Sequence, residues 1–360
     1  MQNMKHFKIY GLLLSLVAVF AFFGCQSQEL TSAKVYLQQR DYVKAEQNLL
    51  TALNIEPENP EVPYLLAVEI YANRNSGKVD LVKAKEYLDM TLQIDATYEP
   101  QNIRILREQL YGNSFNAAVG HYNSVIRDET QDRDADLAQA LTFFGLAADL
   151  QPADPKAAIQ IARIYSELKG NNDKAIASLD KAINKAPGNG ELKAEKARIL
   201  AKDDRVEEAL DMFEKASIND PKNMAIGLRY AQFLYEHSMY EKSAEVYDRL
   251  LMVEPANKDL YFNLGLTYLR LEQMDMAKDQ FETVVALDPE DTQAIAMVGQ
   301  VYFDLKDYSA AEMYFRQLLN IEPENPDYLK RLGVTLTQQG RVEEGLDYYN
   351  RGRALESANQ

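Results

Sequence analysis

The fold is decided by residues 258–291, KDLYFNLGLTYLRLEQMDMAKDQFETVVALDPED, because the pattern of this stretch recurs along the chain. Eight residues before its proline stands a large apolar residue, Phe281, and twelve residues before it a small one, Ala277. A fixed period of this length indicates a repeat protein in which each unit buries its apolar face by stacking on its neighbours. A repeat protein of this kind typically provides a binding surface for partners and is not typical of an enzyme. The prolines that mark the 34-residue period are Pro187, Pro221, Pro255, Pro289 and Pro323.

The composition argues for a large folded core and against a nucleic-acid partner. The chain has 360 residues, of which 46% are hydrophobic and 26% charged, so it is neither disordered nor short of core residues. Its formal net charge is -16 and it has no block of lysine and arginine, which disfavours binding to phosphate backbones. Cys25 is the only cysteine, as expected of an exported protein without disulfides.

The amino terminus differs in composition from the rest of the chain. Lys5 and Lys8 precede an apolar run, residues 9–23, which is too short to span a bilayer comfortably. Small Gly24 and then Cys25 follow this run. The order of charge, apolar run and small residue predicts a secretion signal.

The end of the signal, Phe22-Phe23-Gly24-Cys25, resembles the lipobox of bacterial lipoproteins. That motif usually has leucine where this chain has Phe22 and a small residue where it has Phe23. The resemblance implies a signal peptide of residues 1–24, cleavage before Cys25, and acyl chains such as palmitate on the new amino terminus and its sulfur. Several acyl chains hold a protein stably on a membrane.

Two alternatives to a lipoprotein remain open for this segment. One is an ordinary secretory signal with an incidental cysteine, and the other is an uncleaved anchor helix. If the lipobox is processed, residues 25–33 form a lipidated tether and the start of the first repeat. Gln26 follows the cysteine, and in enteric bacteria the lack of aspartate at that position favours the outer membrane, with the protein facing the periplasm.

The repeats resemble the tetratricopeptide (TPR) family, whose unit is a pair of antiparallel helices. In residues 258–291 the small residues Gly265 and Ala277 stand where the two helices cross, and Pro289 ends the second helix. The large residues Tyr268 and Phe281 fill the space on either side. The resemblance implies an all-α fold, a right-handed superhelical solenoid of about nine helix-turn-helix units.

Residues 155–359 form the regular part of the predicted array. The unit near 155–189 carries one extra residue near Gly170. The last unit has Gly345 and Gly352 where alanine is usual, and each glycine is expected to weaken its helix by about 1 kcal/mol. The predicted units lie near residues 155–189, 190–223, 224–257, 258–291, 292–325 and 326–359.

Residues 34–154 form irregular TPR-like repeats. A polar insertion at 73–80 interrupts the second unit, and an acidic stretch at 128–136 precedes a helix predicted over 137–150. The simplest partner of that helix is a helix over 116–126. This leaves the helical segment 101–111 as an added or fused helix.

The sequence predicts no catalytic residue, metal site or cofactor. His121 and His237 have no second metal ligand at helical spacing, so both are expected to serve in packing or on the surface. No glycine-rich phosphate loop and no nucleophile with a neighbouring base stand out. An enzyme built on the solenoid would need converging polar groups that the sequence does not reveal.

The candidate partner site is the concave groove that first helices line in this family. Its arginines and aromatic residues suit acidic or mixed peptides, through forked hydrogen bonds and stacking. Asn263 resembles the asparagine of family members that clamp a peptide carboxylate, but the other clamp residues are missing and no clamp is predicted. The alternative is that the arginines are solvated and paired with acids, as Arg198 with Glu195. The predicted groove residues are Arg198, Arg229, Gln232, Tyr235, Asn263, Gln300, Phe303 and Arg331.

These observations predict a membrane-anchored scaffold of the bacterial envelope that binds protein partners in the TPR groove. Nucleic acid and small-molecule substrates are not expected as ligands. The alternative is a component of an exopolysaccharide secretion machine or of a pilus and secretin assembly machine. Both rest on analogy with TPR lipoproteins, because a fold does not fix a function.

Overall fold

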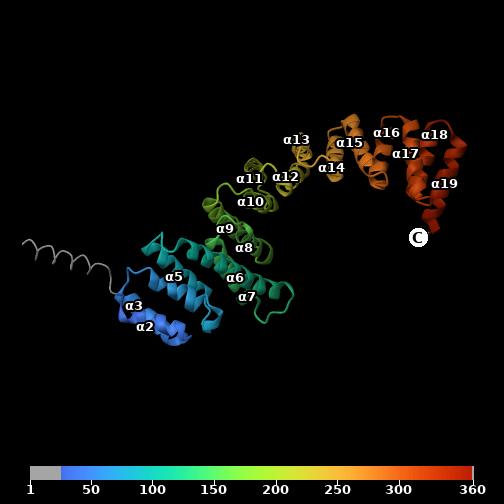
Figure 1. Cartoon of the computed structure of the whole chain (residues 1–360). Helices are drawn as coiled ribbons and strands as arrows, with labels where there is room; N and C mark the ends of the chain where they lie inside the picture. Colours follow the sequence, from blue (N-terminus) through green and yellow to red (C-terminus); the bar gives the residue numbers. More distant parts are fainter. Residues whose placement is uncertain (1–25, 359–360) are drawn as a thin grey trace, which may run out of the picture. The chain divides into compact units, whose positions relative to one another are not determined.

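The computed structural model describes residues 26–358, and every regular element in that range is helical (Figure 1). The predicted signal peptide and Cys25 lie outside the described residues. The chain divides into two compact units, one ending at Lys174 and one beginning at Ala175. The helix order gives nine consecutive pairs in the described range, which confirms the predicted all-α, TPR-type solenoid.

The amino-terminal unit begins with two helix pairs (blue in Figure 1). Helix α2 (Gln28–Gln38) packs against α3 (Tyr42–Ile55). Helix α4 (Glu61–Leu65) continues as a π-helical turn, η1 (Leu66–Tyr71), and packs against α5 (Leu81–Ile94). The insertion predicted between the helices of this second pair forms a loop with one short 3-10 turn.

The third pair is built on one long helix. Helix α6 (Pro100–Ile126) has 27 residues and packs against α7 (Arg133–Leu150). Its first half buries Leu106 and Leu110 in the core shared with the first two pairs, and its second half buries Ala118 in the core shared with α7. The two segments predicted separately are therefore fused into one helix, because each half has its own core to cover.

The fourth pair contains a second π-helical turn. Helix α8 (Lys156–Arg163) continues as η3 (Ile164–Leu168) and is followed by α9 (Asn172–Lys185), which crosses the boundary between the two units. The amide of Lys169 bonds to the carbonyl of Ile164, five residues back. The extra residue of this repeat is thus absorbed by a wide turn at the end of the first helix.

The carboxy-terminal unit contains five regular helix pairs. Each first helix follows an asparagine or aspartate whose side chain accepts from an amide of the first turn, as Asn257 does from Leu260. The second helices α11, α13, α15 and α17 also pack against the first helix of the next pair. The pairs are α10 (Gly190–Lys202) with α11 (Val206–Asn219), α12 (Met224–Glu236) with α13 (Tyr240–Leu251), α14 (Lys258–Arg270) with α15 (Met274–Leu287), α16 (Thr292–Asp304) with α17 (Tyr308–Ile321), and α18 (Pro326–Gln338) with α19 (Val342–Ala358).

The helix crossings have the composition that the repeat pattern predicts. Phe281 is fully buried, and a methyl group placed on Gly265 would lie only 2.7 Å from its Cε1 atom. Phe315 stands in the same relation to Gly299, where the corresponding distance is 2.9 Å. The aromatic ring of the second helix therefore occupies the space that a side chain on the first helix would need.

The glycines of the last pair lie at a close contact between its two helices. A methyl group on Gly345 would lie 2.6 Å from the carbonyl oxygen of Gly333, and one on Gly352 would lie 2.7 Å from that of Pro326. Both glycines are buried between α18 and α19. They let these two helices approach more closely than alanine would permit, in addition to any cost in helix propensity.

None of the helices in residues 26–358 combines the length and the hydrophobicity that a membrane crossing requires.

Replacing Gly265 with leucine tests the repeat register. The leucine side chain must displace the ring of Phe281, so we expect Gly265→Leu to lower the free energy of unfolding by about 1–3 kcal/mol. Thermal unfolding followed by circular dichroism measures the change. A melting curve identical to that of the wild type would show that the crossing is assigned to the wrong residues.

The close approach of α18 and α19 predicts that alanine at Gly345 destabilises the protein, whereas alanine at an unpacked helical glycine should stabilise it. Gly345→Ala should destabilise the protein by about 1–3 kcal/mol, since the new methyl group meets backbone atoms. The matched control is Gly120→Ala, at an exposed position within α6 where nothing lies within 4 Å. That change should stabilise by about 0.5–1 kcal/mol, and an equal gain from both variants would contradict the packing argument.

Candidate partner-binding groove

The predicted groove residues all lie on first helices of the carboxy-terminal unit, on α10, α12, α14, α16 and α18. The structure brings them to three cavities, and each of the eight lines at least one of these. The 34-residue period places equivalent residues on equivalent faces of successive helices. We call the surface formed by these cavities the first-helix face.

The cavity over α10 and α12, here called the cationic pocket, has a volume of about 420 Å³. Arg198, Lys202 and Arg229 supply positive charge on its walls. Phe213 and Phe233 also line it, with ring centroids 5.1 Å apart. The cavity thus combines cationic groups with an aromatic surface.

A buried carboxylate positions the two arginines. The side chain of Glu195 is only 1% exposed. Arg198 donates to its Oε1 from Nε at 3.1 Å and from Nη2 at 2.7 Å, as the alternative interpretation of these arginines expects. Arg229 Nη1 lies 3.6 Å from Oε2. The guanidinium groups remain at the surface, with side-chain exposures of 32% for Arg198 and 46% for Arg229.

The next cavity, over α12 and α14, has a volume of about 450 Å³ and no charged residue in its lining; we call it the neutral pocket. Its walls include Leu228, Tyr247 and Leu266, and it shares Gln232 with the cationic pocket. Burial raises the pKa of Tyr247 to about 12, so its hydroxyl stays neutral at physiological pH. This cavity suits an apolar or aromatic side chain.

Two predicted residues of the neutral pocket are held by contacts within the chain. Asn263 donates from Nδ2 to the carbonyl of Asp259 at 2.8 Å, which turns its amide nitrogen toward its own helix. Tyr235 accepts a hydrogen bond from Arg270 Nε at 2.9 Å. The orientation of Asn263 gives no support to a carboxylate clamp.

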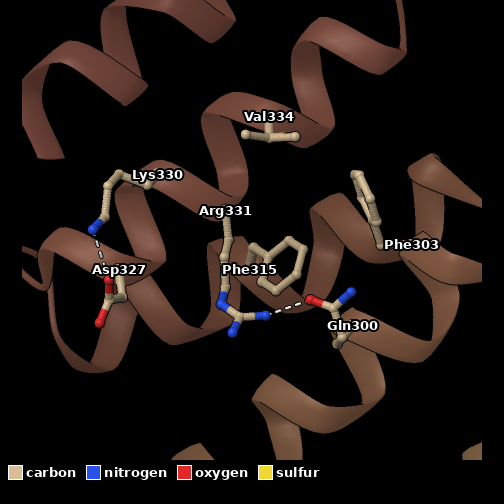
Figure 2. A pocket seen from close by; sticks show the side chains of 7 residues that line it. All are labelled: Gln300, Phe303, Phe315, Asp327, Lys330, Arg331 and Val334. Carbon is tan, nitrogen blue, oxygen red and sulfur yellow. Dashed lines mark hydrogen bonds and ion pairs between the residues drawn. The ribbon is translucent and has the colours of Figure 1, made fainter. Parts of the chain in front are cut away.

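The third cavity lies over α16 and α18 and has a volume of about 300 Å³ (Figure 2). Figure 2 shows Arg331 extended toward Gln300, to which its guanidinium is hydrogen-bonded. Lys330 is paired with Asp327 at 2.9 Å and with Glu356 at 3.1 Å. Phe303 and the other apolar lining residues complete the cavity, whose cations already have partners.

The two histidines of the described range serve packing and local bonding. His121 Nδ1 lies 2.6 Å from Asp136 Oδ1, and this contact joins α6 to α7. Hydrogen bonds from Thr130 and then His121 hold the pKa of Asp136 below its ordinary value. His237 Nδ1 lies 2.8 Å from the carbonyl of Phe233. Residues 26–358 contain no cluster of side chains that would hold a metal ion.

Family models assign the repeats directly. The model "Psidin, N-terminal TPR repeats region" matches residues 160–273, and two tetratricopeptide-repeat models match residues 259–291 and 297–359. The chain therefore carries tetratricopeptide repeats over residues 160–359, which confirms the predicted repeat family. No curated protein matches the chain significantly.

Several solved structures resemble part of this chain. The crystal structure of MamA protein is 15% identical, covers 47% of this chain and 92% of its own, and superposes with a TM-score of 0.43. YrrB, described as a TPR protein with an unusual peptide-binding site, is 21% identical, covers 50% and 92%, and has a TM-score of 0.43. MamA 41-end from Desulfovibrio magneticus RS-1 is 21% identical, covers 46% and 96%, and has a TM-score of 0.38.

Proposed function

We propose that this chain is a protein-protein interaction scaffold of the bacterial envelope, held on a membrane by lipid at Cys25, whose first-helix face binds peptides or helices of partner proteins. The observation that carries the proposal is the occurrence of three cavities along the first helices, over α10 and α12, over α12 and α14, and over α16 and α18. A single site would suit a compact ligand, whereas several sites along one face suit a chain that runs across several repeats.

The chemistry of the first-helix face supports a protein ligand. Its cavities offer guanidinium, amide and aromatic groups, such as Arg229, Gln232 and Phe303, that bind peptide carboxylates, peptide amides and apolar side chains respectively. None of these groups forms a nucleophile with a neighbouring base, and we propose no enzymatic activity.

The proposed membrane attachment rests on the sequence Phe22-Phe23-Gly24-Cys25 and the apolar run before it. Acylation at Cys25 would supply two or more lipid chains, enough for stable attachment to a bilayer. With Gln26 after the cysteine, we propose the outer membrane, facing the periplasm, as the location.

Site-specific photocrosslinking tests whether the first-helix face binds the partner. A photoreactive amino acid at Gln232 or Val334 should form adducts in intact cells, whereas one at Met313, 64% exposed on the second helix α17, should not. Reversing Arg198, Arg229 and Arg331 to glutamate should remove the adducts made from Gln232 and Val334. Equal adducts from Met313, or adducts unaffected by the reversals, would refute binding at this face.

Metabolic labelling tests the anchor. The wild-type chain should incorporate a palmitate analogue and sediment with membranes, whereas Cys25→Ala should incorporate none and lose its attachment, because the acylated sulfur is gone. Label retained in the Cys25→Ala chain would refute lipidation at this residue. Absence of label from the wild-type chain would also refute lipidation at Cys25.

A further inference from the structure

We infer that the cationic pocket and the neutral pocket form one bipartite site for a peptide segment in which acidic residues lie beside an aromatic or long aliphatic residue. This inference rests on the proposed function, since it specifies the ligand of the first-helix face. It concerns α10, α12 and α14, which belong to one compact unit.

The local charge of the cationic pocket is opposite to that of the chain. Arg198, Lys202 and Arg229 contribute three positive charges, and Glu236 with the buried Glu195 contributes two negative ones, so the formal charges of these five groups sum to +1. The whole chain carries -16. The cavity attracts carboxylates, whereas the rest of the acidic surface repels them. This charge pattern therefore directs an acidic ligand to the cavity.

Two cations of this pocket can turn toward a ligand. Lys202 is exposed, and its side chain forms no hydrogen bond or ion pair within the part of the chain that the structure describes. Arg229 Nη1 lies 3.6 Å from Glu195, beyond hydrogen-bond distance, and its side chain is 46% exposed. The exposed guanidinium of Arg229 can therefore present N–H groups to a ligand carboxylate while its Nη1 stays beside Glu195.

The neutral pocket supplies the apolar half of the site. Gln232 lines both cavities, so the two are neighbours on either side of this residue. Leu228, Leu266 and Tyr247 line the neutral pocket, and burying an apolar side chain among them contributes favourable free energy that a charged side chain would lose. Gln232 Nε2 donates to Glu236 Oε1 at 2.9 Å, and its amide oxygen can accept a hydrogen bond from the backbone of a peptide that lies across both cavities.

The third cavity differs from this site in the state of its cations. Arg331 is bonded to Gln300, and Lys330 is paired with Asp327 and Glu356. A ligand carboxylate there would have to replace these contacts. The geometry therefore assigns acid recognition to the pocket of Arg198, Lys202 and Arg229.

Fluorescence anisotropy with synthetic peptides and the purified full chain in detergent tests the assignment. The probe is a short fluorescein-labelled peptide with several aspartates on one side of a single phenylalanine. We expect it to bind at least about tenfold more tightly than a copy with asparagine for aspartate, and more tightly than a copy with serine for phenylalanine. Added salt should weaken the binding of the aspartate peptide.

A matched pair of charge reversals locates the effect. Lys202→Glu should weaken binding of the aspartate peptide about tenfold, whereas Lys222→Glu should leave it within about twofold. Lys222 is exposed, lies outside the three cavities and gives the same change in net charge. Neither lysine side chain forms a hydrogen bond or ion pair in the described part of the chain, so both variants should fold normally. Arg229→Gln should reproduce the loss without reversing a charge.

The outcomes separate this inference from the proposed function. Equal binding of the aspartate and asparagine peptides, equal effects of Lys202→Glu and Lys222→Glu, or no binding of the aspartate peptide at millimolar concentration would each overturn the inference. Photocrosslinks from Gln232 and Val334 would then still support a scaffold that binds partners of other chemistry. Loss of those crosslinks would refute the scaffold whatever the peptides do.

Discussion

The structure depends on the close approach of two helices at a position where one of them has no side chain or only a small one. Gly265 and Gly299 sit against the rings of Phe281 and Phe315, so each ring fills the volume that its neighbour leaves open. Packing at this density leaves no room for an added methylene group. Because this contact recurs after 34 residues, α14 with α15 and α16 with α17 cross in the same way and each offers the next pair a similar surface.

The first-helix face follows from that repetition. Second helices such as α13, α15 and α17 are covered on one side by their own partner and on another by the first helix of the next pair. The outward faces of the first helices are not needed for stacking, and their side chains are free to vary. Arginine, glutamine and aromatic residues occupy these positions in α10 to α18 without disturbing the core.

The sequence predicted the helix pairs and the surface location of the groove residues, since both depend on periodicity, but it missed features that depend on three-dimensional context. Glu195 reads as one more acidic residue on a helix, yet it is buried and holds Arg198. Gly345 was expected to weaken its helix, because propensity is visible in a sequence and the carbonyl of Gly333 beside it is not. The wide turn of η3 was visible only as one extra residue.

Electrostatics decides how selective the first-helix face can be. Repulsion from an acidic surface acts over about a Debye length, roughly 8 Å at physiological ionic strength, so it slows every acidic ligand without choosing among sites. Attraction by Lys202 and Arg229 acts at contact distance and is screened much less once water is displaced from the pocket. At the proposed bipartite site, an acidic peptide thus gains free energy where its carboxylates reach these two cations. Selectivity for acidic ligands comes from that difference between long-range repulsion and short-range attraction. The neutral pocket beside the cationic pocket adds the requirement that the ligand also carry an apolar side chain.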